Sequence, residues 1–188
     1  MAGPMTRNQT LHETLIPALA AQLGVRRYLE LGTHQNETIG RVAVMLPPDS
    51  VVVGVDVTEP THRARNVAYR IMTSSAYLAG PVSIDAPFDM VFIDADHSAQ
   101  AVLADFYGVL PHVRPDGLIL LHDGNPETEA DTEPGYCGTG WQAIRTITES
   151  HEAVTLPYHP GLTIVRKRAL WGPAPSPLPA DRDSAERS

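Results

Sequence analysis

Two apolar runs in the middle of the chain end in residues that could perform chemistry. The first run, 90–93, is followed by Asp94, Asp96 and His97, and the second ends just before Asp123. Carboxylate oxygens are the ligands that hard divalent cations such as Mg²⁺ prefer. An imidazole, with an unperturbed pKa of about 6.5, can remove a proton near neutral pH. These residue types are therefore compatible with a metal site and a neighbouring general base, although their spacing alone does not favour that interpretation over helix capping.

Purely structural roles are an alternative for several of these side chains. Asp96 and Ser98 are also well placed to cap a following helix, and aspartates at strand ends often do only this. His122 comes one residue before Asp123, and side chains alternate along a strand. We therefore expect His122 to point to the opposite side and to have a structural role.

The segment 89–125 shows how these residues would be positioned. Between its two apolar runs, hydrophobic residues recur at helical spacing, and a Pro-Asp-Gly turn precedes the second run. The pattern predicts a strand, a crossover helix and a second strand. In open α/β sheets, ligands bind outside the carboxyl ends of the strands, so both sets of carboxylates should meet at one edge.

A second polar region is predicted earlier in the chain. The strand 26–32 runs into Gly32, and a helical pattern resumes at 36–46, so the turn between them offers backbone N–H groups to a polar ligand. The apolar strand 51–57 contains Asp56, a carboxylate placed to accept both hydroxyls of a ribose. Glu30 and Asp56 are costly to bury without a partner, and a polar cofactor would supply one.

The other predicted elements complete a single domain over residues 1–171. They are a helix at 9–23, a brief helix at 63–70, a strand at 68–72, a loop at 81–88, a helix at 140–151, and two strands at 153–158 and 162–167. The last two strands are joined by so short a connection that they must be antiparallel. The Pro-rich segment 172–188 has almost nothing to bury and is predicted to be a disordered tail.

The composition of the chain indicates which kinds of molecule it could bind. The net charge of −8 over 188 residues argues against nucleic acid or an anionic membrane surface, and it favours a small-molecule substrate. The single cysteine, Cys137, excludes an internal disulfide. No apolar run is long enough for a membrane span, so we expect a cytoplasmic protein.

Five motifs carry a specific resemblance: YLELGTHQNET, VVVGVDV, FIDADHS, VRPDGLILLHD and GLTIV. Together they resemble class I S-adenosylmethionine-dependent methyltransferases, and most of all the small bacterial metal-dependent O-methyltransferases of catechol-like phenols and antibiotic sugars. The resemblance implies an α/β, Rossmann-like domain. Its sheet would be mostly parallel, seven-stranded and twisted, with a C-terminal antiparallel hairpin and helices on both faces.

The resemblance also implies roles for individual residues. S-adenosylmethionine would be bound by residues of the first strands and turns: Glu30, Gly32, Thr33, Asp56, Thr73, Ser74 and Asp94. A Mg²⁺ ion or another divalent cation would be held by Asp94, Asp123 and Asn125. His97 or Asp96 would be the base that takes the proton from a hydroxyl acceptor.

Three alternatives stay open at this point. One is a metal-independent transfer to nitrogen or carbon, and another is a non-catalytic module that binds S-adenosylmethionine and regulates a partner. The third, a nicotinamide-dependent oxidoreductase, is disfavoured because the first turn lacks G-x-G-x-x-G. The N-terminal region supplies one helix, where many relatives of this type have several that cap the substrate. Either the acidic loop after Asp123 or a second copy in a homodimer is therefore expected to close the site.

Overall fold

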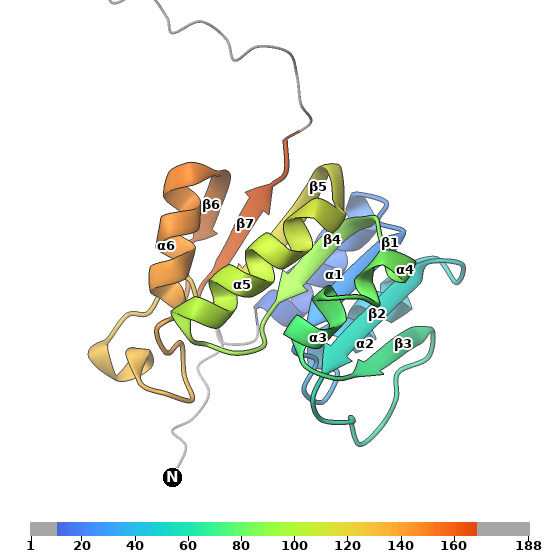
Figure 1. Ribbon diagram of the computed structural model, residues 1–188, viewed down its shortest axis with the longest axis horizontal. Helices are drawn as coiled ribbons and strands as arrows, with labels where there is room; N and C mark the ends of the chain where they lie inside the picture. Colours follow the sequence, from blue (N-terminus) through green and yellow to red (C-terminus); the bar gives the residue numbers. More distant parts are fainter. Residues whose placement is uncertain (1–10, 169–188) are drawn as a thin grey trace, which may run out of the picture.

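The computed structural model describes residues 11–168, which form a seven-stranded sheet with helices on both faces (Figure 1). The elements are, in chain order, α1 (His12–Gln22), β1 (Arg27–Leu31), α2 (Glu37–Met45), β2 (Val51–Asp56), β3 (Val67–Ile71), α3 (Ser74–Leu78), α4 (Val82–Asp85), β4 (Phe88–Ile93), α5 (Ala99–Val109), η1 (Leu110–His112), β5 (Val113–His122), η2 (Glu129–Thr132), α6 (Gly140–Ser150), β6 (Glu152–Leu156) and β7 (Leu162–Arg166). The predicted helix start at residue 9, the domain boundary at 171 and the tail 172–188 lie outside the described residues.

The sheet has the strand order β3-β2-β1-β4-β5-β7-β6. Strands β1 to β5 pair in parallel, whereas β7 is antiparallel to both β5 and β6. This confirms the predicted mostly parallel sheet with a C-terminal antiparallel hairpin. The chain adds β2 and β3 on one side of β1 and then returns to add β4 on the other side. The strand order therefore reverses between β1 and β4, which is where α/β sheets bind their ligands.

Two apolar layers hold the helices against the sheet. On one face, Tyr77, Phe106 and Ile147 from α3, α5 and α6 pack with buried strand residues. On the other face, Ile16 of α1 and Val42 of α2 do the same. Figure 1 shows this division, with α5 and α6 in front of the sheet and α1 and α2 behind it. Burial on both faces explains why the parallel strands are almost continuously apolar in sequence.

The predicted brief helix at 63–70 is wrong. Residues 65–66 form a turn, in which Asn66 adopts a left-handed φ of 61°, and the next residues form β3. The β-branched Val67 pairs with Val52 of β2, and such side chains fit a pleated sheet better than an isolated turn of helix. The strand expected at 68–72 is therefore present, one residue earlier than predicted.

The predicted loop at 81–88 is wrong in part, because it contains α4 and the first residue of β4. Val82 of α4 is buried in the core. Asp85 accepts a hydrogen bond from the Tyr77 hydroxyl at 3.0 Å and pairs with Arg70 at 3.0 Å. Asp85 and its two partners belong to three different elements, so the local sequence pattern does not indicate these contacts. Among residues 11–168, no helix is both long and apolar enough to cross a membrane.

Candidate active site

The carboxyl ends of β1, β4 and β5 meet at one edge of the sheet, the lower edge in Figure 1. Gly32 follows β1 with a φ of 86°, and a Cβ atom at this position would lie 2.0 Å from the backbone oxygen of Asp94. The backbone N–H of Asp94 in turn donates to the oxygen of Leu31 at 2.8 Å. The first turn and the acidic segment after β4 are thus in direct backbone contact and form one site.

The turn after β1 directs backbone N–H groups at Asp56. The N–H groups of Thr33 and His34 each donate to Asp56 Oδ2 at 2.9 Å, and that of Thr58 donates to Oδ1 at 2.8 Å. The hydroxyl of Thr33 is buried and has no hydrogen-bond partner within the described part of the chain. Gly32, Thr33 and Asp56 therefore lie together, as the sequence predicts.

Glu30 is a buried carboxyl beside this turn. It is 2% exposed and accepts a hydrogen bond from the Tyr28 hydroxyl at 2.7 Å. Burial raises the pKa of Glu30 well above its usual range, and the nearby charge of Asp94 acts in the same direction. The hydrogen bond from Tyr28 opposes this rise. A buried carboxyl with a single side-chain partner is costly, so the position suits a polar ligand.

We expect Glu30→Gln to stabilise the ligand-free protein at pH 8. Folding raises the pKa of Glu30, so the ionised carboxyl opposes folding above its unfolded-state pKa, by about 1.4 kcal/mol for each unit of the rise. Glutamine keeps the acceptor for Tyr28 and carries no charge. The gain should therefore be absent at pH 4 and should grow as the pH rises. Urea unfolding followed by circular dichroism measures it, with exposed Glu133→Gln as the matched control; equal curves for both variants at pH 8 would contradict the prediction.

Asp94, His97 and Asp123 form a compact group, with one ligand atom from each lying within 4.8 Å of the others. His97 Nδ1 lies 2.6 Å from Asp123 Oδ2, and Nε2 lies 3.8 Å from Asp94 Oδ1. The hydrogen bond with Asp123 raises the pKa of His97 to about 9, although burial opposes it. Burial also acts against the charge of Asp123, but His122 and His97 hold the pKa of that carboxyl well below its usual range. Asp94 and Asp123, two of the three predicted metal ligands, are thus brought together with His97, the predicted base.

His122 joins this group, so the predicted orientation away from Asp123 is wrong. Its Nδ1 lies 3.0 Å from Asp123 Oδ1 and 3.1 Å from Asp94 Oδ1. The reason is the backbone of Asp123, whose left-handed φ of 63° ends the alternation of the strand and turns the carboxylate back toward His122. A non-glycine residue in this conformation is uncommon and is often found at functional sites.

A further histidine reaches the same place from the N-terminal helix. His12 of α1 packs edge-on against His122, with ring centroids 4.3 Å apart. Burial lowers the pKa of His12 to about 4, and the nearby His122 adds to this effect. For His122, burial also acts downward, but the charge of Asp94 and contacts with Asp123 raise the pKa to about 10. At neutral pH, the imidazole of His12 is thus neutral, and the imidazole of His122 beside it is charged.

Asp96 has a different environment from its neighbours. It is exposed, and its Oδ1 accepts a hydrogen bond from the backbone N–H of Ser98 at 2.8 Å. Ser98 in turn caps α5 by accepting from Ala101 N–H at 3.3 Å. The hydrogen bonds from Ser98 lower the pKa of Asp96. This geometry favours the capping role over the role of a base.

The last predicted site residues lie along the same edge. Thr73 caps α3 by accepting from Ala76 N–H at 3.2 Å, and Ser74 is the first residue of that helix. The preceding Met72 donates its N–H to the backbone oxygen of Asp56 at 2.9 Å, which places this turn beside the end of β2. Asn125 donates its side-chain amide to the oxygen of Tyr158 at 3.3 Å.

The loop between β5 and α6 packs onto His97. The backbone oxygen of Tyr136 contacts His97 Nδ1, and the N–H of Gly140 donates to the His97 oxygen at 2.7 Å. A cavity of about 610 Å³ opens beside this loop, lined by Gly124, Asn125, Trp141 and neighbouring residues. Gly124 and Asn125 directly follow Asp123 in the chain, but Asp94, His97 and Asp123 themselves do not line the cavity.

The sequence of this region decides the family. The model of a family described as a methyltransferase domain matches residues 29–124, just over half of the chain. The chain belongs to this methyltransferase family. The match starts in β1 and ends directly after Asp123, so it includes the first turn, Asp56 and the segment from Asp94 to His97.

One curated protein shows how far the likeness in sequence extends. The methyltransferase is 31% identical to demethylmacrocin O-methyltransferase of Streptomyces fradiae over 80 residues. These residues make up 40% of this chain and 20% of the relative, so the match spans about a fifth of that protein's length.

Solved structures support the fold of the methyltransferase. The O-methyltransferase TomG from Streptomyces achromogenes, involved in tomaymycin synthesis and solved with S-adenosylmethionine, has a TM-score of 0.64 at 23% identity, covering 84% of this chain and 79% of TomG. The Bacillus cereus O-methyltransferase, solved with S-adenosylhomocysteine, has a TM-score of 0.66 at 24% identity, covering 89% and 83%. MycE from the mycinamycin biosynthetic pathway, solved with Mg and S-adenosylhomocysteine, has 0.68 at 19%, covering 97% of this chain and 55% of MycE.

His12 is the residue of the methyltransferase that sequence reasoning missed. It lies outside the matched range 29–124, on a helix predicted only from its apolar spacing. A single polar residue at the start of a helix looks like an ordinary exposed position. The available signal was the number of histidines in so short a chain, eight in 188 residues, several of them next to acidic strand ends.

Proposed function

We propose that the methyltransferase moves the methyl group of S-adenosylmethionine to a hydroxyl group of a small molecule, with the help of a divalent metal ion. The observation that carries this proposal is the convergence of Asp94, His97 and Asp123 at the carboxyl edge of the sheet, directly beside the Gly32 turn. A donor site and a site for deprotonating the acceptor would then be neighbours, as methyl transfer to oxygen requires.

The first turn and its surroundings fit the donor. Gly32 lets the backbone approach closely, and the buried hydroxyl of Thr33, which has no hydrogen-bond partner among residues 11–168, could bind a polar ligand. We assign Asp56 to the ribose hydroxyls, Glu30 to the methionine end, and Thr73 and Ser74 to the adenine. The presence of S-adenosylmethionine in TomG and of S-adenosylhomocysteine in the Bacillus cereus protein supports this assignment.

The acidic cluster fits a divalent ion. Asp94 and Asp123 offer hard carboxylate oxygens, and we assign Asn125 as the third protein ligand from the resemblance. A bound ion would orient the acceptor hydroxyl and lower its pKa. MycE, which shares the fold, was solved with Mg.

His97 is the residue that we assign as the base. In the ion-free site, the contact with Asp123 keeps its imidazole protonated at neutral pH, with a pKa of about 9. His97 can accept a proton once the charges of Asp94 and Asp123 are neutralised, because those charges cause the rise in its pKa. The loop that packs on His97 would exclude water, and the adjoining cavity beside Trp141 would hold the acceptor. Asp96 we assign to helix capping.

The proposal is tested by a transfer assay with methyl-labelled S-adenosylmethionine and a panel of catechols and hydroxylated sugars. We expect labelled product, its loss by at least about 100-fold on chelation, and its recovery on adding Mg²⁺ or another divalent ion. Product that is unaffected by chelation would favour metal-independent transfer. Binding of S-adenosylmethionine with no product from any acceptor would favour the non-catalytic module.

A further inference from the structure

The α1 side of the acidic cluster contains buried imidazole nitrogens that the proposed mechanism does not use. His12 is 8% exposed, and its Nδ1 is buried without a hydrogen-bond partner among the described residues. His122 Nε2 is also buried without a partner among the same residues, whereas Nδ1 of this ring pairs with the carboxylates of Asp94 and Asp123. Leaving several polar atoms unsatisfied in a protein interior is costly. The unpartnered nitrogen on each of the two rings could therefore bind a ligand.

The positions of the nitrogens suit a metal ion. One ligand atom each from His12, Asp94 and His122 lie within 4.8 Å of one another. His122 Nδ1 is 3.1 Å from Asp94 Oδ1 and 3.0 Å from Asp123 Oδ1. Neighbouring ligands at right angles around an ion with bonds of about 2.1 Å stand about 3.0 Å apart. The spacing around His122, which in the ion-free site is that of a hydrogen-bonded ion pair, also fits adjacent ligands of one small ion.

Aromatic packing alone does not account for the arrangement. His12 and His122 both approach Phe92, with ring centroids 5.9 and 6.1 Å away, so part of their surface is ordinary core contact. A phenylalanine or leucine would fill this role without polar atoms to bury. The carboxylates of Asp94 and Asp123 lie next to these nitrogens, and carboxylates and nitrogens together could bind one cation. Binding a cation would explain why polar rings are buried at this place.

The donor set selects the kind of ion. Mg²⁺ prefers oxygen ligands and keeps several waters, whereas imidazole ligands suit iron, cobalt, nickel and zinc. Two histidines and one carboxylate on one side of an ion are a common arrangement for such metals and leave positions open for a substrate. The chemistry at this side of the cluster is thus that of a transition metal.

We propose that His12, His122 and Asp94 hold a first-row transition ion of the iron, cobalt, nickel and zinc group in preference to Mg²⁺. The N-terminal helix α1 then completes the metal site as well as covering the sheet. The inference rests on the proposed function for the use of the ion in methyl transfer, and it changes the identity of that ion.

Metal titration of the metal-free, full-length protein tests the inference without S-adenosylmethionine. We expect Co²⁺, followed by its visible absorption, to bind at least about tenfold more tightly than Mg²⁺, followed by calorimetry. His12→Gln should weaken Co²⁺ binding by at least about tenfold and change Mg²⁺ binding by less than about twofold. His62→Gln, at an exposed histidine, is the matched control and should change neither.

Two results would overturn the inference: equal affinity for the two ions, or a His12→Gln variant that binds Co²⁺ as His62→Gln does. Should His12→Gln fail to fold, low-temperature pulsed electron paramagnetic resonance of the high-spin Co²⁺-loaded protein supplies a second readout. Nitrogen modulation from bound imidazole is expected both in the wild type and in His97→Gln, because His12 and His122 remain. Its absence from His97→Gln would also overturn the inference.

The outcomes separate this inference from the proposed function. A protein that transfers methyl groups but prefers Mg²⁺ keeps the proposed function and loses the transition-metal site. A protein that binds Co²⁺ through His12 but transfers no methyl group to any acceptor keeps the site and loses the proposed function.

Discussion

Asp123→Asn is expected to lower methyl transfer by about 100-fold to 10,000-fold while leaving the affinity for S-adenosylmethionine within about threefold of the wild type. The side chain is 9% exposed and contacts both His97 and His122 at 3.0 Å or less. Asparagine has nearly the same size but no charge. It would weaken the hold on a cation and remove the main cause of the raised pKa of His97.

The measurements are initial rates at saturating metal and calorimetric titration with the cofactor. In the metal-free variant, NMR titration should also show the pKa of His97 falling from about 9 toward its ordinary value, since its charge-stabilising partner is gone. A variant that keeps its activity within about tenfold would show that Asp123 does not act in the transfer step.

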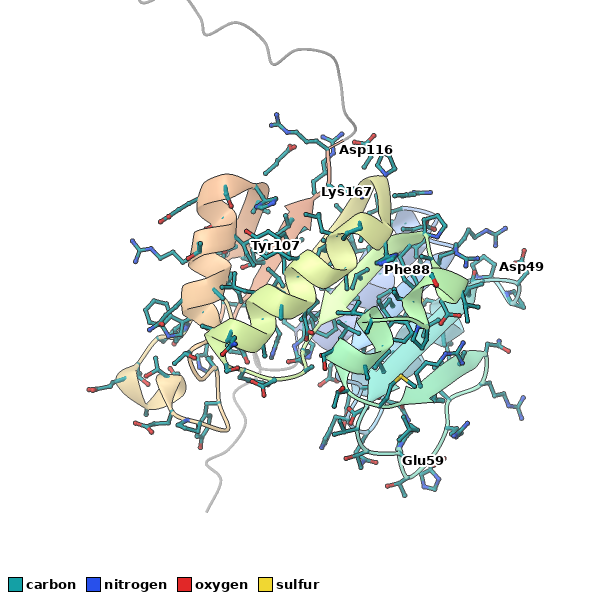
Figure 2. The ribbon with its side chains drawn as sticks, in the orientation of Figure 1. Asp49, Glu59, Phe88, Tyr107, Asp116 and Lys167 are labelled. Carbon is teal, nitrogen blue, oxygen red and sulfur yellow. The ribbon has the colours of Figure 1, made fainter. Side chains whose placement is uncertain are left out.

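Asp116→Asn is the matched control for this variant. Asp116 has the same φ of 63° as Asp123, and it lies within β5, which Asp123 directly follows. It sits at the opposite edge of the sheet, where Figure 2 labels it near Lys167, and it pairs with Arg166 at 2.6 Å. Activity that falls equally in both variants would point to a general effect of the substitution on the strand.

The contrast between His122 and Asp94 explains what sequence alone could predict. Asp94 follows an apolar run and is placed by strand order, so the pattern of parallel strands was sufficient to locate it. His122 was misplaced because alternation holds only while the backbone stays extended, and Asp123 leaves that conformation. An aspartate in the left-handed conformation, such as Asp123, has no clear sequence signature. Because Gly124 follows it, the sequence does not show at which of the two residues the backbone turns.

Gly124 shows a second limit of prediction from sequence, which is that local patterns do not reveal long-range packing. It separates Asp123 from Asn125, and a Cβ atom there would lie 2.5 Å from the hydroxyl oxygen of Thr163 on β7. The glycine is thus required by a strand that is 39 residues away in sequence, through the antiparallel pairing of β7 with β5. His12 is a similar case, because its ring partners Phe92 and His122 lie 80 and 110 residues further along the chain. Long-range packing of this kind decides which polar residues meet, whereas local patterns decide which elements form.

Gly32→Ala should be the most destabilising glycine-to-alanine change within residues 11–168, at about 3–5 kcal/mol, with loss of cofactor binding. Alanine at a left-handed φ costs about 1–2 kcal/mol by itself. Here the added carbon would also lie 2.0 Å from the oxygen of Asp94 and 2.7 Å from the Cα of Ala95. Both are backbone atoms, and Asp94 is tied to Leu31 by a 2.8 Å hydrogen bond, so relief requires the strand ends of β1 and β4 to separate.

Gly24→Ala isolates the conformational part of this cost. Gly24 has a φ of 66°, and no atom lies within 4 Å of a Cβ built on it. It should therefore lose only about 1 kcal/mol, measured by urea unfolding, and should bind S-adenosylmethionine normally. The difference between the two variants measures the contact between the first turn and Asp94. If the two glycines cost the same, the first turn and the acidic segment are not held together as tightly as a shared site for methyl donor and acceptor requires.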